Sequence, residues 1–422
     1  MVSDASGTVP AKGARYVALV LLMIVYAFNY LDRQIVSVLA EPIKNDLHLS
    51  DAEIGMLGGL VFALFYTAFG IPLAYMADRY HRVRIISASC AIWSLFTASC
   101  GLATGFATLA LARIGVGIGE AGGTPPSHSI LADYFPPEKR GGALALYSLG
   151  VPIGTTLGTM IGAWVAAEHG WRTAFLAVGL PGLAAALVVL LFVREPERGR
   201  LDRIKGASDQ RLLSSIVRYF RSPLLVLAAL GGAFASFVWI AMLSWMPPLL
   251  LRTKGMTLGD VAAYYSVVTG VASLSGAVAG GFIADRWGRT NPRSYALVPC
   301  ITLIVSIPFY LIALWLSDWR LIMVVLVVPF TAYAMFMAPT IALIHNSVEP
   351  SRRAMCSAIY LFIINLIGTG GGPLTVGWLS DHFAAEHGLS ALPVAMTVVT
   401  PVFLLAAATY ALAARRIRGP AR

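Results

Sequence analysis

Four ionisable residues lie inside long apolar stretches of this sequence, where charged side chains are rare. Asp32 and Arg33 interrupt the first such stretch, and Arg113 and Glu120 lie seven residues apart in the fourth. In a helix this spacing places Arg113 and Glu120 on one face, two turns apart. Carboxylates and guanidinium groups in such a setting can exchange protons, hold an anion or form ion pairs.

The energetic cost of these charges separates a structural interpretation from a functional one. At the centre of a bilayer each costs roughly 2.5 to 3.5 kcal/mol, so four cost on the order of 10 kcal/mol unless they are paired or hydrated. Two ion pairs that join the first and fourth helices are the structural alternative. Buried pairs are often replaceable by apolar residues without loss of stability. A transport role therefore explains the charges better.

The composition requires an integral membrane protein. Of the 422 residues, 58% are hydrophobic and only 12% are charged, and the mean hydropathy is +0.75. These values exclude a secreted disulfide scaffold, a disordered chain and a nucleic-acid binder. The four cysteines are isolated in or beside apolar segments, so we expect them to be packing residues. We expect no metal, no cofactor and no enzymatic activity, because no catalytic cluster or phosphate-binding loop has credible spacing.

Twelve apolar runs are long enough to cross a membrane, which needs about 20 residues. The sequence predicts an all-α protein of two six-helix bundles, residues 1–193 and 223–422, joined by a cytoplasmic linker, 194–222. The expected spans are 16–39, 54–77, 85–103, 106–131, 140–166, 171–193, 223–251, 258–284, 294–316, 321–345, 353–380 and 389–414.

The basic residues fix the expected orientation. Twenty-four of the 31 Lys and Arg residues lie on the side of the termini and the linker, five lie on the opposite side, and two lie inside helices. Cytoplasmic loops carry such an excess, so we expect both termini and the linker in the cytoplasm and the chain in the inner membrane. The net charge of +10 then follows from topology and contact with membrane lipids, without a nucleic-acid partner. Because Asp32 and Arg33 interrupt a full-length first helix, we expect no cleaved signal peptide.

Two short segments recur at matching points of the two halves. Residues 74–82 and 281–289 both place Ala-Asp-Arg at a helix end followed by basic residues, and Ala-Ala-Glu-His-Gly occurs at 166–170 and at 384–388. The offsets are 207 and 218 residues. Membrane transporters are often built from such internal repeats, so the chain is expected to contain two parallel repeats.

These residues carry a resemblance to a known family, the major facilitator superfamily (MFS). The family's loop signature G-x-x-x-D-R-x-G-R is complete at 281–289, whereas Ala74 and His81 replace its two glycines in the first half. Residues 29–33, 113–121 and 194–199 resemble the bacterial spinster-like subgroup, although organic-anion symporters share patterns like the first two. The resemblance implies a monomeric alternating-access transporter whose helices 1, 4, 7 and 10 line a central cavity. It also implies a lysolipid or sphingoid-like substrate.

Depth along the helices predicts which charges meet. Asp32 and Arg113 each lie about 10 Å below the outer ends of their helices, so the two can reach each other. Glu120 lies two turns deeper, without a cation one turn away in its own helix, where desolvation favours the neutral acid. We therefore expect proton coupling at Glu120, with Asp32 as the second candidate. The residues expected to bind substrate are Arg33, Arg113, Tyr26 and Asn29.

The second half differs because its helices carry almost no charge at depth. Its seventh and tenth helices are instead rich in aromatic residues and methionine: Phe234, Phe237, Trp239, Trp245, Phe330, Tyr333, Met335, Phe336 and Met337. These residues pack in the protein or face the lipid, or they form an apolar wall opposite the charged one, which would suit an amphiphile. We expect His128 and His345 to be hydrogen-bonded packing residues in preference to proton carriers.

Two further patterns relate to movement. Gly150, Gly154, Gly158 and Gly162 form a small-residue ridge that lets another helix approach closely, and the glycines at 368–372 suggest a flexible or broken segment. The repeated Ala-Asp-Arg loops predict a cytoplasmic gate that forms in one conformation and breaks in the other. The expected gate residues are Asp78, Arg79, Arg140, Asp285, Arg286, Arg289 and Arg352, with Arg353 as an alternative partner.

The sequence thus predicts a secondary active transporter, coupled to protons, for an amphiphilic or anionic small molecule. One alternative is an organic-anion/proton symporter, which would be indifferent to acyl-chain length. An alternative of another class is a membrane sensor that binds ligand without transporting it.

Overall fold

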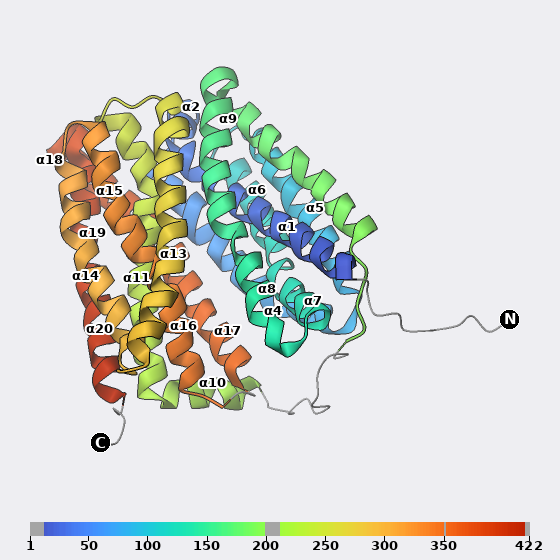
Figure 1. The fold of residues 1–422 in the computed structure, drawn as a ribbon. Coiled ribbons are helices and arrows are strands. Elements are labelled where there is room, and N and C mark those ends of the chain that lie inside the picture. The colour runs from blue at the N-terminus through green and yellow to red at the C-terminus, as the bar shows by residue number, and fades with distance from the viewer. Residues whose placement is uncertain (1–11, 199–211, 350–351, 418–422) are drawn as a thin grey trace.

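The computed structural model describes all residues except 1–11, 199–211, 350–351 and 418–422 (Figure 1). The described chain is helical throughout, with short turns between helices. The elements of the first half are α1 (Lys12–Val38), α2 (Ala40–Leu47), α3 (Asp51–Gly55), the π-helical turn η1 (Met56–Leu60), α4 (Val61–Arg79), α5 (Arg82–Cys100), α6 (Phe106–Glu120), α7 (Thr124–Tyr134), α8 (Pro137–Ser148) and α9 (Gly150–Phe192).

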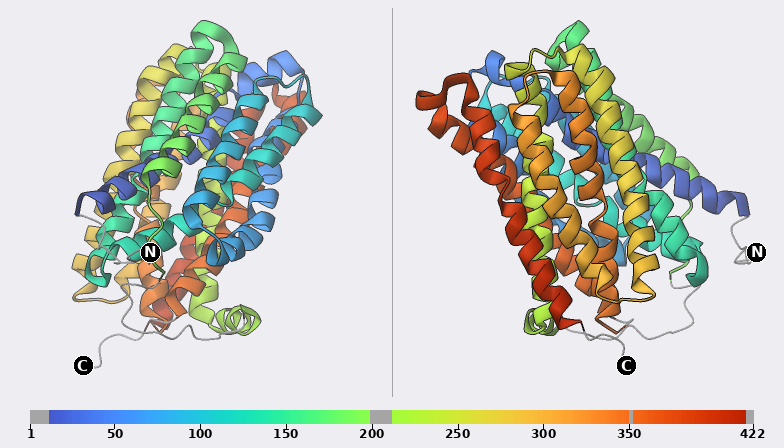
Figure 2. Two further views of the ribbon diagram at one scale, coloured as in Figure 1. Left: turned by 90° about the vertical axis from the view of Figure 1, so that its right-hand side faces the viewer. Right: turned by 60° about the vertical axis from the view of Figure 1, so that its left-hand side comes forward.

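The second half begins with a short helix that lies across the end of the bundle, and its long helices run along the bundle axis (Figure 2). Its elements are α10 (Leu212–Arg221), α11 (Pro223–Thr253), α12 (Leu258–Asp260), η2 (Val261–Tyr265), α13 (Ser266–Gly288), α14 (Ser294–Trp315), α15 (Trp319–Ala334), α16 (Met337–Asn346), α17 (Arg353–Ile364), η4 (Asn365–Thr369), α18 (Gly370–His387), η5 (Gly388–Ser390), α19 (Ala391–Val399) and α20 (Val402–Arg416).

The prediction of twelve membrane-crossing segments is confirmed. Nine apolar helical stretches of the described chain are long enough to cross a membrane, and two of them, Lys139–Phe192 and Met355–Arg416, each hold two crossings. The first of these is divided at Gly170, whose φ of 81° breaks the helix. The twelfth crossing consists of α6 and α7, which a turn at 121–123 separates. The division into bundles at 193 and 223 stays a prediction.

The glycine ridge of α9 fixes the position of α1. A Cβ at Gly150 would lie 2.8 Å from the Met23 carbonyl oxygen, and one at Gly158 would lie 2.7 Å from that of Leu31. A Cβ at Gly154 would overlap the carbonyl oxygen of Ala27. The glycines and the α1 residues that they contact both recur every four residues, so the two helices pack backbone against backbone over several turns. The predicted close approach is confirmed, and its partner is the helix that carries Asp32 and Arg33.

The internal repeat also appears in local structure that the sequence comparison missed. Ser50 and Glu53 form a capping box at the start of α3, and Thr257 and Asp260 form one at the start of α12. The offset is 207 residues, the same as that between the two Ala-Asp-Arg loops. Each capping box is followed by a π-helical turn, η1 in the first half and η2 in the second. Both repeats therefore enter their second crossing with the same cap and the same irregular turn.

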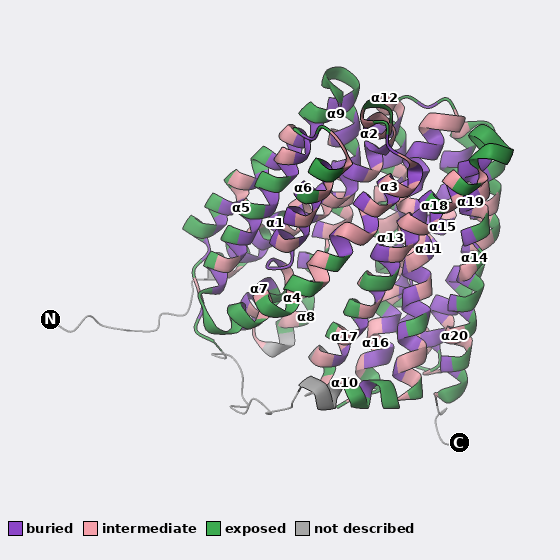
Figure 3. Cartoon of the chain, turned by 180° about the vertical axis from the view of Figure 1, so that it is seen from behind, coloured by how far each residue is buried: buried purple, intermediate pink, exposed green. Residues whose placement is uncertain are grey.

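Buried side chains line the interior of the bundle, and exposed residues cover its outer faces (Figure 3). The largest apolar cluster contains residues of both halves, among them Leu57 and Trp245, and lies toward the end that holds α2 and α12 (Figure 3). Two further clusters, one confined to residues 18–193 and the other to residues 219–414, lie toward the opposite end. We call these the closed end and the basic end. The halves therefore share one core at the closed end and have separate cores at the basic end.

Candidate functional site

An ion pair between α1 and α6 forms the centre of the charged site. Arg33 Nε donates to Glu120 Oε2 at 2.7 Å, and the Glu120 side chain is fully buried. The Arg33 guanidinium also lies over the rings of Phe62 and Tyr66, 4.7 Å from each ring centroid. The Tyr30 ring centroid lies 5.0 Å from the same guanidinium, so a charge-assisted hydrogen bond and three cation–π contacts hold this arginine in one orientation.

The other two buried charges are not paired with each other. Asp32 is 1% exposed, and its Oδ1 has no hydrogen-bond partner in the described chain. Arg113 lies over the Phe62 ring at 5.2 Å, and its Nε donates to the Leu57 carbonyl oxygen at 3.4 Å. No ion pair within 4.0 Å joins these two fully described side chains. The expectation that Asp32 pairs with Arg113 is therefore wrong for this conformation, and the cation beside Glu120 comes from α1 and not from its own helix.

Glycines hold α6 against its two neighbours and so set the depth of both its charges. A Cβ at Gly117 would lie 2.9 Å from the Phe62 carbonyl oxygen on α4, and one at Gly119 would lie 2.7 Å from the Trp93 backbone nitrogen on α5. α6 is therefore packed tightly against both α4 and α5 in the turn that precedes Glu120. The Glu120 side chain is thereby directed toward α1.

The predicted residues Tyr26 and Asn29 lie on α1 beside this ion pair. The Tyr26 ring stacks on Tyr147 with a centroid separation of 4.4 Å and meets Tyr30 edge to face at 5.2 Å. Asn29 is 2% exposed, and no described residue forms a hydrogen bond with its Oδ1. An unpartnered buried amide oxygen is costly, so Asn29 is available to a ligand or to a different side-chain arrangement.

The aromatic residues of the second half divide into packing residues and half-buried ones. Trp245, Phe330 and Phe336 are at most 2% exposed, and the Trp245 indole donates to the Pro373 carbonyl oxygen at 2.9 Å. Trp239 and Tyr333 are only half-buried and stack at a centroid distance of 4.0 Å. Trp239 lies on α11, which packs against α1. Part of the predicted apolar wall is therefore core, and the Trp239–Tyr333 stack lies close to the charged helix.

The isolated histidines and cysteines have packing environments. His345 Nε2 is 2.7 Å from the Ser357 hydroxyl, and the His128 ring meets the edge of Tyr147 at 5.3 Å. All four cysteines are buried and free, as expected of packing residues.

Four of the predicted gate residues have side chains that contact groups of their own halves in this conformation. The Asp285 carboxylate accepts from the Tyr295 hydroxyl at 2.9 Å, and Arg352 lies 3.5 Å from Glu349. In the first half the Arg140 Nε donates to the carbonyl oxygens of Ala132 and Phe135, and the Arg79 guanidinium lies over the Tyr75 ring. For Arg286 and Arg289 the structure gives no side-chain partner in the described chain. The gate itself stays a prediction.

The motif at 194–199 anchors the Asp78 loop. Buried Arg82 binds Glu195 and Asp133, each at 2.5 Å, and donates to the Pro196 carbonyl oxygen at 2.9 Å. Arg198 donates to the carbonyl oxygens of 77, 78 and 80 at the end of α4. This segment thus connects the end of the sixth crossing to the loop after the second crossing. Its last residue, Gly199, lies outside the described residues.

The sequence analysis missed a charged network that joins the two halves at the closed end. Arg252 of α11 binds Glu41 and Asp51, each at 2.8 Å, and Lys44 binds Asp51 at 2.6 Å. The Asp381 carboxylate of α18 accepts from the backbone N–H groups of Asp51 and Ala52 at 3.0 and 2.7 Å. Asp381 therefore caps the N-terminus of α3 from the other half.

A signal for this network was present in the sequence. Lys44 and Arg252 were counted only as loop charges, yet each lies near the end of an apolar run on the side with few basic residues. Acidic residues at the ends of the second and eleventh spans lie on that same side. Pairing opposite charges on this side would have pointed to the network.

The fold and the charged site can now be compared with known proteins. The family model "Major Facilitator Superfamily" matches residues 22–373. The chain belongs to the Major Facilitator Superfamily. It has the family's all-α membrane fold of two six-helix pseudo-symmetric bundles, and its relatives assign it to the spinster-like subgroup.

Three relatives support the subgroup. An MFS-type efflux pump of Mycolicibacterium smegmatis is 34% identical over 96% of this chain and 93% of its own. Protein spinster homolog 1 of Xenopus tropicalis is 28% identical over 86% of this chain and 72% of its own. The crystal structure of a bacterial homolog of the human lysosomal transporter Spinster, inward-facing and unoccupied, has a TM-score of 0.87 at 31% identity, covering 96% of this chain and 98% of that one.

Membership of this family defines the general activity. The chain is a multi-pass membrane transporter and not an enzyme, and its bacterial homologues support a location in the inner membrane. A small molecule is its substrate.

Proposed function

We propose that the protein is a proton-coupled transporter of an amphiphilic or anionic small molecule that works by alternating access. The observation that carries the proposal is the buried ion pair between Arg33 and Glu120, with Asp32 buried and unpaired beside it. Neutralising Glu120 with a proton would remove the partner that holds Arg33. The arginine would then be free to bind a substrate anion or to turn toward Asp32.

The proposed binding site has a charged wall and an apolar wall. Arg33, Arg113 and Asn29 would recognise an anionic or polar head group, with Tyr26 packed beside them, and the Trp239–Tyr333 stack would contact an apolar portion. Lysolipids and sphingoid-like molecules have this composition. The efflux pump among the relatives favours export as the direction of transport.

The proposed conformation is open toward the cytoplasm. A shared core and a charged network at the closed end, with separate cores at the basic end, are what an inward-facing state requires. The basic end would then face the cytoplasm, as its excess of Lys and Arg favours, with both termini on that side. The predicted cytoplasmic gate would form only after the halves rotate.

Proteoliposome flux with the Glu120→Gln variant tests the proton site. The assay compares a fluorescent lysophospholipid, a sphingoid base and an organic anion without an acyl chain, each with and without an imposed pH gradient. Wild-type protein is expected to concentrate the acyl-chain substrates in response to the gradient. Because Gln cannot exchange a proton, Glu120→Gln is expected to bind substrate but to lose the response to the gradient.

Two comparisons make this test specific. Asp32→Asn in the same assay shows whether the unpaired carboxylate carries the coupling instead of Glu120. Glu386→Gln is the control, because that side chain is exposed at the closed end. Gradient-driven accumulation that persists in Glu120→Gln would remove Glu120 from the mechanism, and exclusive transport of the organic anion would favour the symporter alternative. Binding of a substrate without any flux would favour a sensor.

A further inference from the structure

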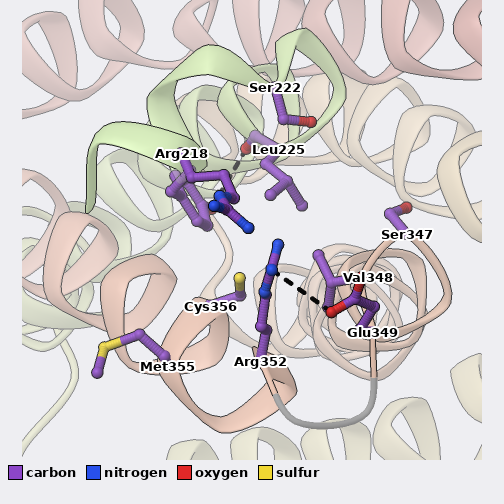
Figure 4. A pocket seen from close by; sticks show the side chains of 10 residues that line it. Arg218, Ser222, Leu225, Ser347, Val348, Glu349, Arg352, Met355 and Cys356 are labelled. Atoms are coloured by element: carbon purple, nitrogen blue, oxygen red, sulfur yellow. Dashed lines mark hydrogen bonds and ion pairs between the residues drawn. The ribbon is translucent and has the colours of Figure 1, made fainter. Parts of the chain in front are cut away.

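A pocket of about 330 Å³ lies at the basic end of the second half, away from the charged site (Figure 4). Its walls come from α10, the start of α11, the turn after α16 and the start of α17. Tyr219 fixes α10 in place, since its ring is 1% exposed and its hydroxyl donates to the Leu225 carbonyl oxygen at 3.3 Å. The pocket is therefore built between the linker helix and the transmembrane bundle.

Two arginines converge in this pocket. Figure 4 shows the side chains of Arg218, from α10, and Arg352, from the start of α17, pointing toward one another. Among the described residues that line the pocket, the one carboxylate is that of Glu349, which is 3.5 Å from Arg352 and whose side chain is 68% exposed. Arg218 has no ion-pair partner in the described part of the chain. The pocket thus carries a net positive charge, and the two guanidinium groups repel each other unless an anion lies between them.

An independent observation also points to a missing ligand. The Arg352 Nε is buried and has no hydrogen-bond partner among the residues that the structure describes. A buried donor without a partner costs free energy, and this cost is removed when an anion accepts its hydrogen bond. Guanidinium groups bind phosphate and carboxylate oxygens in paired hydrogen bonds, so a phosphate between the arginines would satisfy both of them.

The surroundings favour a phosphate that belongs to a lipid. Leu225, Val348 and Met355 give the pocket apolar surface beside its charges. On α10, which lies across the end of the bundle, Val217 and Phe220 are 43% and 55% exposed. A short helix with exposed apolar residues and neighbouring arginines is typical of a segment that lies in the membrane interface.

We propose that this pocket binds the phosphate of an anionic phospholipid between Arg218 and Arg352. The bound lipid would connect the linker helix to the loop between the tenth and eleventh crossings. This site is separate from the transport site, and its occupation does not depend on which substrate is carried.

Lipid retention measured by native mass spectrometry tests the proposal. The full chain in detergent is titrated with phosphatidylglycerol and, separately, with phosphatidylcholine. Wild-type protein is expected to retain one phosphatidylglycerol in preference to phosphatidylcholine. Loss of a charge-assisted hydrogen bond in Arg218→Gln should weaken this retention about tenfold or more, and Arg218→Lys should restore part of it.

The control variant is Arg221→Gln, on the same helix but outside the pocket lining. It removes the same charge from the helix, so equal losses in Arg218→Gln and Arg221→Gln would overturn the pocket in favour of general attraction to anionic lipid. Melting temperatures without added lipid show that each variant is folded.

A second measurement separates the lipid from a soluble anion. Inorganic phosphate is added to the lipid-free protein, and the melting temperature is followed for wild type and Arg218→Gln. Phosphate could raise the melting temperature of wild type alone while both proteins retain phosphatidylglycerol equally. That result would overturn the assignment to a lipid and assign the site to a soluble phosphate. No response to either probe would overturn the anion site altogether.

Discussion

At the residue scale, the four buried charges are unequally satisfied. Arg33 has a carboxylate and three aromatic rings around it, whereas Arg113 has one backbone carbonyl, at 3.4 Å, and one ring. An incompletely satisfied buried guanidinium is well suited to accept an anion, since binding supplies the hydrogen bonds that the protein does not. Arg113 is therefore the residue from which we expect the largest contribution to substrate binding.

Arg113→Ala is expected to weaken substrate binding by roughly tenfold or more, because a charge-assisted hydrogen bond contributes about 1.5 to 3 kcal/mol. The measurement is tryptophan-fluorescence titration with the member of the substrate panel that wild type transports best. Arg320→Ala is the control, because Arg320 is exposed at the closed end. An unchanged affinity in Arg113→Ala would remove this residue from the binding site.

The sequence predicted which residues are buried charges but not how they pair. Counting 1.5 Å per residue from the helix ends placed Asp32 and Arg113 at a similar depth. Depth does not specify how each helix is rotated about its axis, and rotation decides whether Arg33 or Asp32 faces α6. The neighbours that set this rotation, Phe62 and Trp93, are far away in sequence, so this part of the site required the structure.

At the element scale, the contact between α1 and α9 connects the fold to the site. Backbone contact along the glycine ridge leaves α1 no freedom to shift toward α9, and α1 carries Asp32 and Arg33 on the same turns. A methyl group added in the middle of this contact would force the helices apart. The position of the charged side chains would change with the helix.

Gly154→Ala is expected to destabilise the protein by about 1 to 3 kcal/mol, as overpacking does, because its Cβ would overlap the Ala27 carbonyl oxygen. Gly142→Ala is the matched control in α8, since its Cβ would have no heavy atom within 4 Å, and there alanine should be neutral or slightly stabilising. Thermal unfolding in detergent measures both. Equal melting temperatures for the two variants would show that the ridge tolerates separation of the helices.

Regular and irregular elements differed in how well they could be predicted. Apolar length was sufficient to find all twelve crossings, and glycine spacing was sufficient to predict a close helix contact. The π-helical turns η1 and η2 have no comparable signal, because their sequences, MLGGL at Met56–Leu60 and VAAYY at Val261–Tyr265, share no residue pattern. The capping boxes that precede them are visible in the sequence once the 207-residue offset is applied.

At the scale of the whole molecule, the two ends of the bundle are stabilised differently. The closed end combines a shared apolar core with Arg252 bound to two carboxylates and with α3 capped from the other half by Asp381. The predicted gate of the basic end consists of residues that are exposed or half-buried in this conformation. A change of state must break the contacts of the closed end and form those of the predicted gate at the basic end. A substitution that weakens the closed end should therefore move the equilibrium in the opposite direction to one that weakens the gate.

Asp381→Asn is expected to shift the population toward the other conformation, in which the halves separate at the closed end. The amide has one acceptor in place of two and directs an N–H₂ group at a backbone N–H of α3, and loss of a helix cap costs about 0.5 to 2 kcal/mol. A cost near 1.4 kcal/mol would change the ratio of the two states about tenfold. Spin-label distances across the closed end measure that ratio, with Glu386→Gln on the same helix as the control. Asp285→Asn should act in the opposite direction, because it removes a contact that only the state closed at the basic end is expected to make. If Asp381→Asn and Glu386→Gln give the same distance distribution, the cap does not contribute to closure, and the network around Arg252 must hold this end by itself.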